Sequence, residues 1–221
     1  MAIIDLKVLY EDNHIMVVEK PENVLSQGDN TNDESMLEII KEYLKVKYNK
    51  PGNVFVGLVH RLDRRVSGVM VFAKTSKAAS RLSEAIRDNL FTKKYQAIVS
   101  GIINGNEKLI HYLSKVDGKA IEDKNGKESI LFYSQIKSFK IGNKDFTLLD
   151  IDLITGRYNQ IRKQLSLIGH PIVNDYKYGY TGENHNDAFG LRCVEISFPH
   201  PISKEILKFR SDFNGYWKEF I

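Results

Sequence analysis

The chain has 221 residues, of which 42% are hydrophobic, and it carries a formal net charge of +4. This length suffices for one sizeable domain, which we expect to span residues 1–221. The single cysteine, Cys193, excludes an internal disulfide framework, and no apolar stretch is long enough to span a bilayer. Because the N-terminus also shows no leader pattern, the sequence predicts a soluble, cytoplasmic protein with no membrane partner.

The charge is distributed unevenly along the sequence. Residues 1–59 hold 6 Lys and Arg against 10 Asp and Glu, whereas residues 60–94 hold 9 Lys and Arg against 3 Asp and Glu. The overall charge is too small to indicate nucleic-acid binding by itself. Its concentration in residues 60–94 is typical of a surface that follows phosphates, although a solvated helix face explains part of it.

The N-terminal region predicts a hairpin that opens the domain. Two short apolar runs, at residues 8–10 and 14–18, flank a polar turn and predict a pair of strands. Lys20-Pro21 follows the second run, and its simplest interpretation is a strand terminator.

Two helices are predicted on either side of residues 50–74. Thr31 and Glu34 have the spacing of a capping box, which predicts a helix over about residues 34–48. Thr75-Ser76 is a typical cap for a second helix that continues to about residue 88. Each helix has one apolar face, which we expect to lie in the core.

The most informative segment is residues 59–74. Apolar runs on both sides predict buried strands that flank a short polar turn. The turn holds one carboxylate, Asp63, among three arginines, and Ser67-Gly68 offers a place for a sharp change of direction. A carboxylate among fixed cations should stay ionised, so Asp63 is a candidate nucleophile. A surface cluster of ion pairs is the alternative interpretation.

The region after the second helix is rich in predicted strands. Residues 91–99 predict a strand with Tyr95 near its start, and turn pairs such as Asp117-Gly118 divide residues 101–152 into an antiparallel meander. Two runs at residues 193–198 and 206–209 predict a closing hairpin. Tyr216-Trp217 should pack against the domain.

Residues 153–179 predict a strand, a glycine turn and a helix that ends at Gly169. Ile161 and Leu165 share an apolar face of this helix. Arg162 directly follows Ile161 near the helix start, a position from which its side chain could reach inward to a buried site; a cation on the helix surface is the alternative interpretation.

Three segments, in order, resemble the motifs of the RluA-type RNA pseudouridine synthases. They are His60-Arg61-Leu62-Asp63 followed by Ser67-Gly68, then Lys93-x-Tyr95 ahead of an apolar strand, and finally Thr155-Gly156-Arg157 with Gln160-Ile161-Arg162 and Gly169-His170-Pro171. The resemblance extends over about residues 8–210. It implies an α+β fold, in which a mixed, mostly antiparallel sheet is flanked by helices, as a single catalytic domain with no N-terminal S4 RNA-binding domain.

The resemblance also implies an activity, the isomerisation of specific uridines in rRNA or tRNA to pseudouridine. The implied catalytic residues are Asp63 as the nucleophile, Tyr95, and Arg162 as the partner of Asp63. The implied RNA-binding residues are Arg61, Arg64, Arg65, Arg157 and Gln160. The reaction needs no cofactor or metal, and the expected partner is structured RNA, with the protein acting as a monomer without an obligatory protein partner. Whether Asp63 attacks the ribose or the uracil stays open.

Some residues depart from the family pattern. Asn159 and Gln164 stand where the family commonly has histidines, and Tyr158 replaces a small residue. These changes concern substrate contacts and leave the three catalytic positions intact. His60 and His170 lie at a strand end and a helix stop, so we expect neither a metal nor an acid or base role for them.

Two other functions are compatible with the same residues. A glycoside-cleaving or nucleoside-cleaving enzyme with Asp63 as nucleophile would normally need a second carboxylate as acid, and the turn supplies only one. A catalytically silent RNA-binding domain would tolerate the loss of Asp63, Tyr95 or Arg162, yet all three are present.

Overall fold

The computed structural model describes residues 6–31, 33–213 and 215–220. Residues 1–5, where we expected no leader, lie outside the described residues. The chain divides into two compact units, one of Met1–Thr92 with Glu195–Ser211 and the other of Lys93–Val194 with Asp212–Ile221. The expectation of one domain over residues 1–221 therefore stays a prediction.

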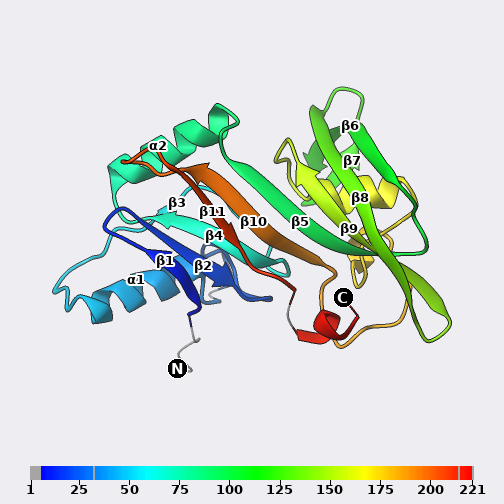
Figure 1. The fold of residues 1–221 in the computed structure, drawn as a ribbon, viewed down its shortest axis with the longest axis horizontal. Coiled ribbons are helices and arrows are strands. Elements are labelled where there is room, and N and C mark those ends of the chain that lie inside the picture. The colour runs from blue at the N-terminus through cyan, green and yellow to red at the C-terminus, as the bar shows by residue number, and fades with distance from the viewer. Residues whose placement is uncertain (1–5, 32, 214, 221) are drawn as a thin grey trace. The chain divides into compact units, whose positions relative to one another are not determined.

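The first unit is built on antiparallel strands (Figure 1). Its strands are β1 (Val8–Glu11), β2 (Ile15–Lys20), β3 (Gly57–Leu58), β4 (Ser67–Ala73), the end of β10 (Leu191–Pro199) and β11 (Ile206–Arg210). They follow the order β1-β2-β4-β10, with β3 paired to β4 and β11 paired to β10. Both predicted hairpins are confirmed. Strands β2 and β4 are buried along their whole length, which explains why each contains a continuous apolar run without alternation, residues 15–18 in β2 and 69–73 in β4.

Helix α1 (Met36–Lys47) begins later than the sequence predicted. The predicted capping box of Thr31 and Glu34 is wrong, because the cap is Ser35, whose backbone N–H and hydroxyl both donate to the Glu38 carboxylate at 3.0 Å. The Thr31 hydroxyl instead bonds to Asp29 within the preceding loop. Two consecutive Ser/Thr-x-x-Glu patterns occur in this segment, Thr31 to Glu34 and Ser35 to Glu38, and the one adjacent to the apolar face forms the cap.

Helix α2 (Ser76–Arg87) confirms the second predicted helix and its cap. The Thr75 hydroxyl accepts a hydrogen bond from the Ala78 N–H at 3.1 Å. The helix packs against β3 and β4, and its buried residues are Ala78, Leu82 and Ala85. It thereby covers the strand that follows the Asp63 turn.

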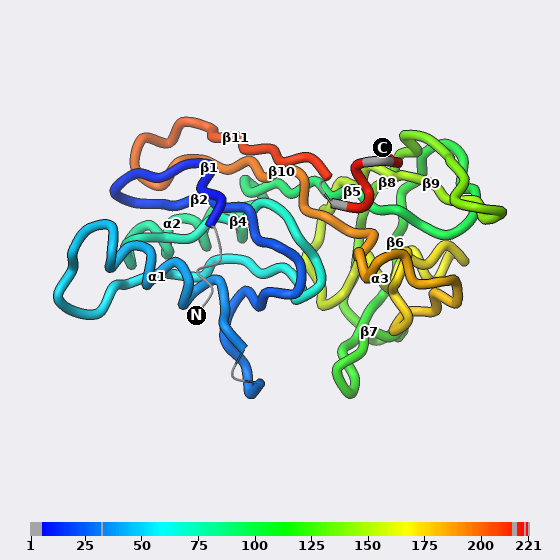
Figure 2. Tube along the Cα trace, turned by 90° about the horizontal axis from the view of Figure 1, so that it is seen from below, coloured from blue at the N-terminus to red at the C-terminus, as the bar shows by residue number. Residues whose placement is uncertain are grey.

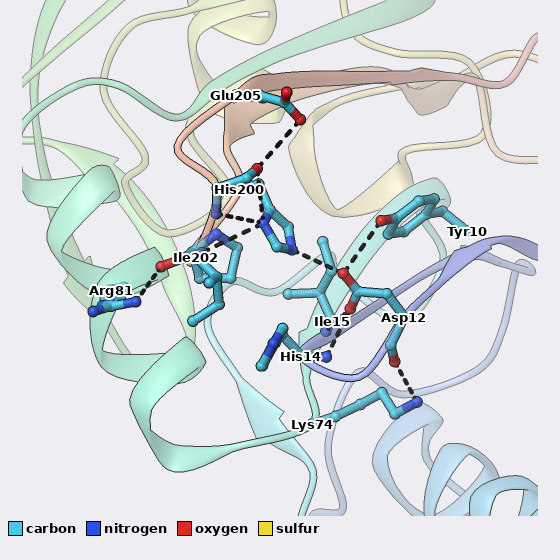
Figure 3. Close-up of polar contacts among 11 residues, drawn as sticks. Tyr10, Asp12, His14, Ile15, Lys74, Arg81, His200, Ile202 and Glu205 are labelled. Atoms are coloured by element: carbon cyan, nitrogen blue, oxygen red, sulfur yellow. Dashed lines mark hydrogen bonds and ion pairs between the residues drawn. The ribbon is translucent and has the colours of Figure 1, made fainter.

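A partly buried polar network joins the β1–β2 turn to the turn after β10 (Figure 3). Asp12 accepts hydrogen bonds from the His14 and Ile15 N–H groups, both at 2.7 Å, and from His200 Nε2 at 2.8 Å. His200 Nδ1 accepts the Ser203 N–H at 3.0 Å, so the proton of the neutral ring sits on Nε2. Burial favours a higher pKa for Asp12, but the two backbone donors and His200 outweigh it and lower the pKa. The network holds these two turns together within the first unit.

The second unit contains the predicted meander. Its strands are β5 (Thr92–Ser100), β6 (Asn106–Val116), β7 (Lys119–Glu122), β8 (Lys127–Ile141) and β9 (Lys144–Leu153), in the order β5-β9-β8-β6-β7. All of their pairings are antiparallel, and the β6–β7 hairpin projects from this unit (Figure 2). Together with the first unit, this confirms an α+β fold with mostly antiparallel strands.

Helix α3 (Gln160–Leu167) is the only α-helix in the described part of the second unit, which also has short 3-10 turns η1 (Tyr176–Tyr178) and η2 (Gly215–Glu219). The helix contacts β6, β7 and η1. Gly169 follows it with φ +82°, which confirms the predicted glycine stop. Trp217 is buried in a core that includes Ile98, Phe146 and Val173, which confirms the packing expected for the C-terminal segment.

Candidate active site

The Asp63 turn lies in the first unit, directly before β4. The turn is closed by a hydrogen bond from the Val66 N–H to the Asp63 carbonyl at 3.0 Å. Ser67 and Gly68 already belong to the strand, so our prediction that they form the turn was wrong by a few residues. Gly68 has φ +129°, a backbone conformation that disfavours residues with a Cβ. The Asp63 side chain is half-buried.

Lys20 holds the residue that follows Asp63. Its Nζ atom donates to the Arg64 carbonyl at 2.9 Å and to the carbonyls of Pro21 and Val24 at 2.9 and 2.7 Å. The whole residue is 0% exposed. Burial lowers the pKa of Lys20 to about 7, while the nearby negative charge of Asp63 acts in the opposite direction. From the sequence we favoured a strand terminator at Lys20-Pro21, whereas the structure shows that the Lys20 side chain binds the turn at the Arg64 carbonyl.

Ser26 holds the residue that precedes Asp63. Its hydroxyl donates to the Leu62 carbonyl at 2.7 Å and accepts the Leu62 N–H at 3.1 Å. Both backbone neighbours of Asp63 are therefore fixed by side chains, one from the last residue of β2 and one from the segment that follows β2. This segment also contacts the Arg64 side chain, through an ion pair with Asp33 at 2.6 Å and a bond to the Asn23 carbonyl at 3.3 Å.

The three arginines of the turn differ in exposure. Arg61 and Arg64 are exposed, and Arg65 is half-buried. The ion pair of Arg64 with Asp33 leaves both side chains nearly half exposed, at 46% and 47%. An exposed pair of this kind contributes little to stability, so an RNA phosphate can compete for Arg64.

Arg162 lies in the second unit, on the first turn of α3. Its Nε and Nη2 atoms donate to the two oxygens of Asp175, each at 2.7 Å. The side chains are only 10% and 1% exposed, so this is a buried, two-pronged ion pair. The expectation that Arg162 reaches inward is confirmed. Asp175 was not singled out in the sequence, because nothing in the spacing of the two residues indicates that they meet.

Aromatic rings flank the Arg162 guanidinium. Its central carbon lies 4.9 Å from the centre of the Tyr178 ring and 5.3 Å from that of Phe189. The Tyr178 hydroxyl in turn accepts hydrogen bonds from the Asn159 amide at 3.0 Å and from the Ala120 N–H at 2.8 Å. Asn159, which departs from the family pattern, thus supports the aromatic surface beside Arg162.

Tyr95 is buried on β5, also in the second unit. Lys93 lies two residues earlier on the same strand, so both side chains project from the same face. Burial lowers the pKa of Lys93. A side-chain carbon at position 156 would lie 3.6 Å from Lys93 Nζ, which places this ammonium group beside the Gly156-Arg157 turn.

Gln160 does not fit its predicted role in RNA binding. It is 2% exposed. Its amide oxygen accepts hydrogen bonds from the Thr155 hydroxyl and the Arg157 N–H, at 2.8 and 2.9 Å, and its amide nitrogen donates to the Ile130 carbonyl and to Gln164. Its polar atoms are thus used inside the fold. Arg157, by contrast, is exposed, with Nε bonded to the Glu128 carbonyl at 3.1 Å.

The ring nitrogens of the two motif histidines form hydrogen bonds to backbone groups of the fold. His60 Nε2 accepts the Val71 N–H at 3.1 Å, and His170 Nδ1 lies 2.9 Å from the Ser100 carbonyl. Among the residues that the structure describes, no group of three or more His, Cys, Asp or Glu side chains is arranged to hold a metal ion. Within the same part of the chain, no helix is both long and apolar enough to cross a membrane.

The predicted catalytic residues are thus divided between the units, with Asp63 in the first and Tyr95 and Arg162 in the second. Each lies in a well-defined local environment. The pairing of Asp63 with Arg162 stays a prediction.

Comparison with known proteins identifies the family. Residues 14–167 match the family model described as RNA pseudouridylate synthase. The chain is 32% identical over 207 residues to an uncharacterized RNA pseudouridine synthase of Mycoplasma genitalium, 28% over 241 residues to tRNA pseudouridine synthase C of Vibrio parahaemolyticus, and 33% over 232 residues to ribosomal large subunit pseudouridine synthase C of Buchnera aphidicola. These matches cover 88%, 99% and 97% of this chain, and 64%, 95% and 71% of the respective relatives.

A solved structure supports the fold. The human RNA pseudouridylate synthase domain containing 1 superposes with a TM-score of 0.76 at 19% identity, over 96% of this chain and 85% of the other. At this identity the likeness bears on the fold alone. Taken with the family match over residues 14–167, the chain belongs to the RluA-type family of RNA pseudouridine synthases, which are isomerases.

Proposed function

We propose that this chain converts uridine to pseudouridine in structured RNA, either ribosomal or transfer RNA, with Asp63 as the nucleophile. The observation that carries the proposal is the way in which the Asp63 turn is held. Ser26 fixes both backbone polar groups of Leu62, and Lys20 fixes the carbonyl of Arg64. A carboxylate on a turn anchored on both sides has the fixed position that a nucleophile needs. Relatives named for tRNA and for the large ribosomal subunit support both substrate classes.

The reaction is a rearrangement within one nucleotide. The N1–C1′ bond breaks, the uracil turns, a C5–C1′ bond forms, and C5 loses a proton while N1 gains one. The target uridine has to leave any base stack before Asp63 can reach it. Asp63 acts on the anomeric carbon or on the uracil ring. The net reaction is redox-neutral, and no water is consumed.

Tyr95 and Arg162 would act from the second unit. The Tyr95 ring stacks on the uracil, and its phenol assists the loss of the C5 proton. Arg162 keeps Asp63 ionised and oriented through a charge-assisted hydrogen bond. These roles give both units a necessary part in the reaction.

The arginines outside the catalytic set would bind the RNA. Arg61 holds the flipped nucleotide out of the helix, whereas Arg64, Arg65 and Arg157 contact phosphates. Gln160 is left out of this set because its amide is used inside the fold. Phosphate contacts position the RNA but do not select its sequence, so the choice of uridine depends on RNA shape and on the flipped base.

The substitution Asp63→Asn tests the proposal. It removes the nucleophile with almost no change in volume, so we expect pseudouridine formation on unmodified rRNA and tRNA transcripts to fall by at least about 1,000-fold. Asp29→Asn, an exposed carboxylate in a nearby loop, is the matched control and should keep full activity. A folded Asp63→Asn protein whose activity stays within about tenfold of the wild type would refute the assignment.

A further inference from the structure

Two lysines gather on the ring of Tyr158 in the second unit. Lys115 Nζ lies 4.5 Å from the ring centre, and Lys177 Nζ lies 5.7 Å from it. Tyr158 has no part in the proposed function, and it stands where the family motif has a small residue. We infer that Lys115, Tyr158 and Lys177, here called the Tyr158 cluster, bind a backbone phosphate of the RNA close to the target nucleotide. The inference rests on the proposed function, because it adds a contact to the same RNA.

Hydrogen bonds to one turn hold the cluster in place. The turn joins β6 to β7, and its residues Asp117 and Gly118 have φ +46° and +69°, as in a tight two-residue hairpin. The Gly118 carbonyl accepts the Tyr158 hydroxyl at 3.0 Å and Lys177 Nζ at 2.7 Å. The ring and one ammonium group are therefore fixed to the same backbone oxygen, on the hairpin that projects from this unit (Figure 2).

Both ammonium groups have N–H donors left for a ligand. Lys177 uses one of its three donors on Gly118, and among the residues that the structure describes Lys115 Nζ forms no hydrogen bond. Within the same residues neither lysine forms an ion pair, and both are exposed. Asp117, the acidic residue of the turn, likewise pairs with neither of them in the described ranges. The cluster therefore presents positive charge that attracts an anion.

The ligand that suits this arrangement is a phosphate and not a base. The ammonium group of Lys115 stands over the Tyr158 ring, on the surface where a base would stack. Lysine binds phosphate as a point charge, so two ammonium groups beside one ring can share a phosphate without strict geometry. Stability gives a weaker reason for the cluster, because the ring is 41% exposed and a cation over an exposed ring contributes little.

The cluster lies beside the surroundings of Arg162 within the same unit. Lys177 Nζ is 5.9 Å from the centre of the Tyr178 ring, and the Arg162 central carbon is 4.9 Å from the centre of that same ring. Arg157, a proposed phosphate contact, directly precedes Tyr158 in the chain. The phosphate bound by the cluster therefore belongs to a nucleotide near the one on which Arg162 acts.

Filter binding of Lys115→Met and Lys177→Met to an unmodified tRNA transcript tests the cluster, whether or not that transcript is a substrate. The control, Lys140→Met, also removes one positive charge, from an exposed lysine of β8 whose partner is Asp145. We expect each cluster variant to bind about fivefold more weakly and to reduce the slope of log K against log salt by about one unit. Lys140→Met should bind like the wild type. Both cluster lysines are exposed, so the variants should fold, and urea unfolding checks this.

Substitution of the ring separates a phosphate contact from a base contact. If Tyr158 acts by holding the lysines, Tyr158→Ala should weaken binding about threefold in the wild type but add little to a protein that already carries Lys115→Met and Lys177→Met. An equal loss in both backgrounds would mean that a base stacks on the ring, and would overturn the phosphate assignment. Tyr158→Phe keeps the ring and removes only the bond to Gly118, so it provides the same cycle if Tyr158→Ala does not fold.

Neutral linkages locate the phosphate. In a synthetic stem-loop that carries the uridine modified by the wild type, methylphosphonate replaces one phosphate at a time on either side of the target. One of these linkages should weaken binding by the wild type about fivefold but leave binding by Lys115→Met unchanged, because the charge contact is already lost. If no linkage near the target behaves in this way, the cluster does not bind the RNA where we place it.

Wild-type affinity in both lysine variants, or an equal loss in Lys140→Met, would also overturn the inference. Either result leaves the proposed function intact if Asp63→Asn is inactive. An active Asp63→Asn protein refutes the function itself, whatever the lysine variants bind.

Discussion

The two proposed halves of the active site are held in different ways. In the first unit, Lys20 and Ser26 bind backbone atoms on either side of Asp63. In the second unit, Asp175 binds the Arg162 side chain itself. The difference follows from the secondary structure, because Asp63 lies on a turn and Arg162 on a helix.

A turn and a helix leave different parts of a residue free to move. A turn has few internal hydrogen bonds, so its backbone moves unless other groups hold it, whereas the short side chain of an aspartate follows its backbone closely. A helix backbone is already fixed by its own hydrogen bonds, but an arginine side chain keeps several free torsions. We infer that the supporting residues are placed where freedom remains: on the backbone at Asp63 and on the side chain at Arg162.

The substitution Lys20→Met gives the largest effect that this comparison predicts. It removes the buried donor from three backbone carbonyls, including that of Arg64. We expect the free energy of unfolding to fall by roughly 2–4 kcal/mol and the single-turnover rate by about 100-fold. Urea unfolding and pseudouridine assays measure the two quantities, with Lys7→Met, an exposed lysine paired to Glu19, as control. A stable, fully active Lys20→Met protein would show that the turn does not need its backbone anchor.

Local sequence patterns predicted most of the fold but not these anchors. The apolar runs of β2 and β4, the Thr75 cap of α2 and the glycine after α3 are all signals within a few residues. Lys20 and Arg64 are 44 residues apart, and Arg162 and Asp175 are 13 apart. Their contacts depend on how the chain folds back, which no spacing rule reports.

Gln160 differs from these anchors, which the sequence did not reveal. Its motif suggested a role in RNA binding that its burial does not support. A glutamine near a proposed catalytic arginine has the polar groups for RNA contact, and the sequence does not show that Thr155, Arg157 and Ile130 satisfy them. The Asp63 turn was recognised because His60-Arg61-Leu62-Asp63, followed by Ser67-Gly68, resembles a family motif, whereas its charges alone also fitted a surface cluster of ion pairs.

The pH dependence of the free energy of unfolding tests whether the pKa of Lys20 is lowered in the folded protein. Burial lowers its pKa to about 7 in the folded protein, whereas a lysine in an unfolded chain titrates near 10.4. Between these values the unfolded state binds more protons, so stability should rise with pH, by up to about 1.4 kcal/mol per unit at 25 °C. Urea unfolding at about pH 6.5, 8 and 9.5 should show this rise in the wild type but not in Lys20→Met. An equal slope in both proteins would mean that Asp63 and the three carbonyl acceptors keep Lys20 charged despite its burial.

The smallest predicted effect concerns the surface of the Asp63 turn. Arg65→Ala and Arg64→Ala should each weaken RNA binding and reduce the slope of log K against log salt by about one unit, while the single-turnover rate at saturating RNA stays nearly unchanged.

Asp33→Asn tests the same arginine from the other side, because it removes the acidic partner of Arg64 in the exposed ion pair. If RNA phosphate competes with Asp33 for Arg64, this variant should bind RNA slightly more tightly than the wild type, and combining it with Arg64→Ala should abolish the gain. Filter binding at several salt concentrations measures all four proteins. A loss of rate rather than affinity in Arg64→Ala would instead place Arg64 with the groups that anchor the turn, because its carbonyl already takes part in that anchor.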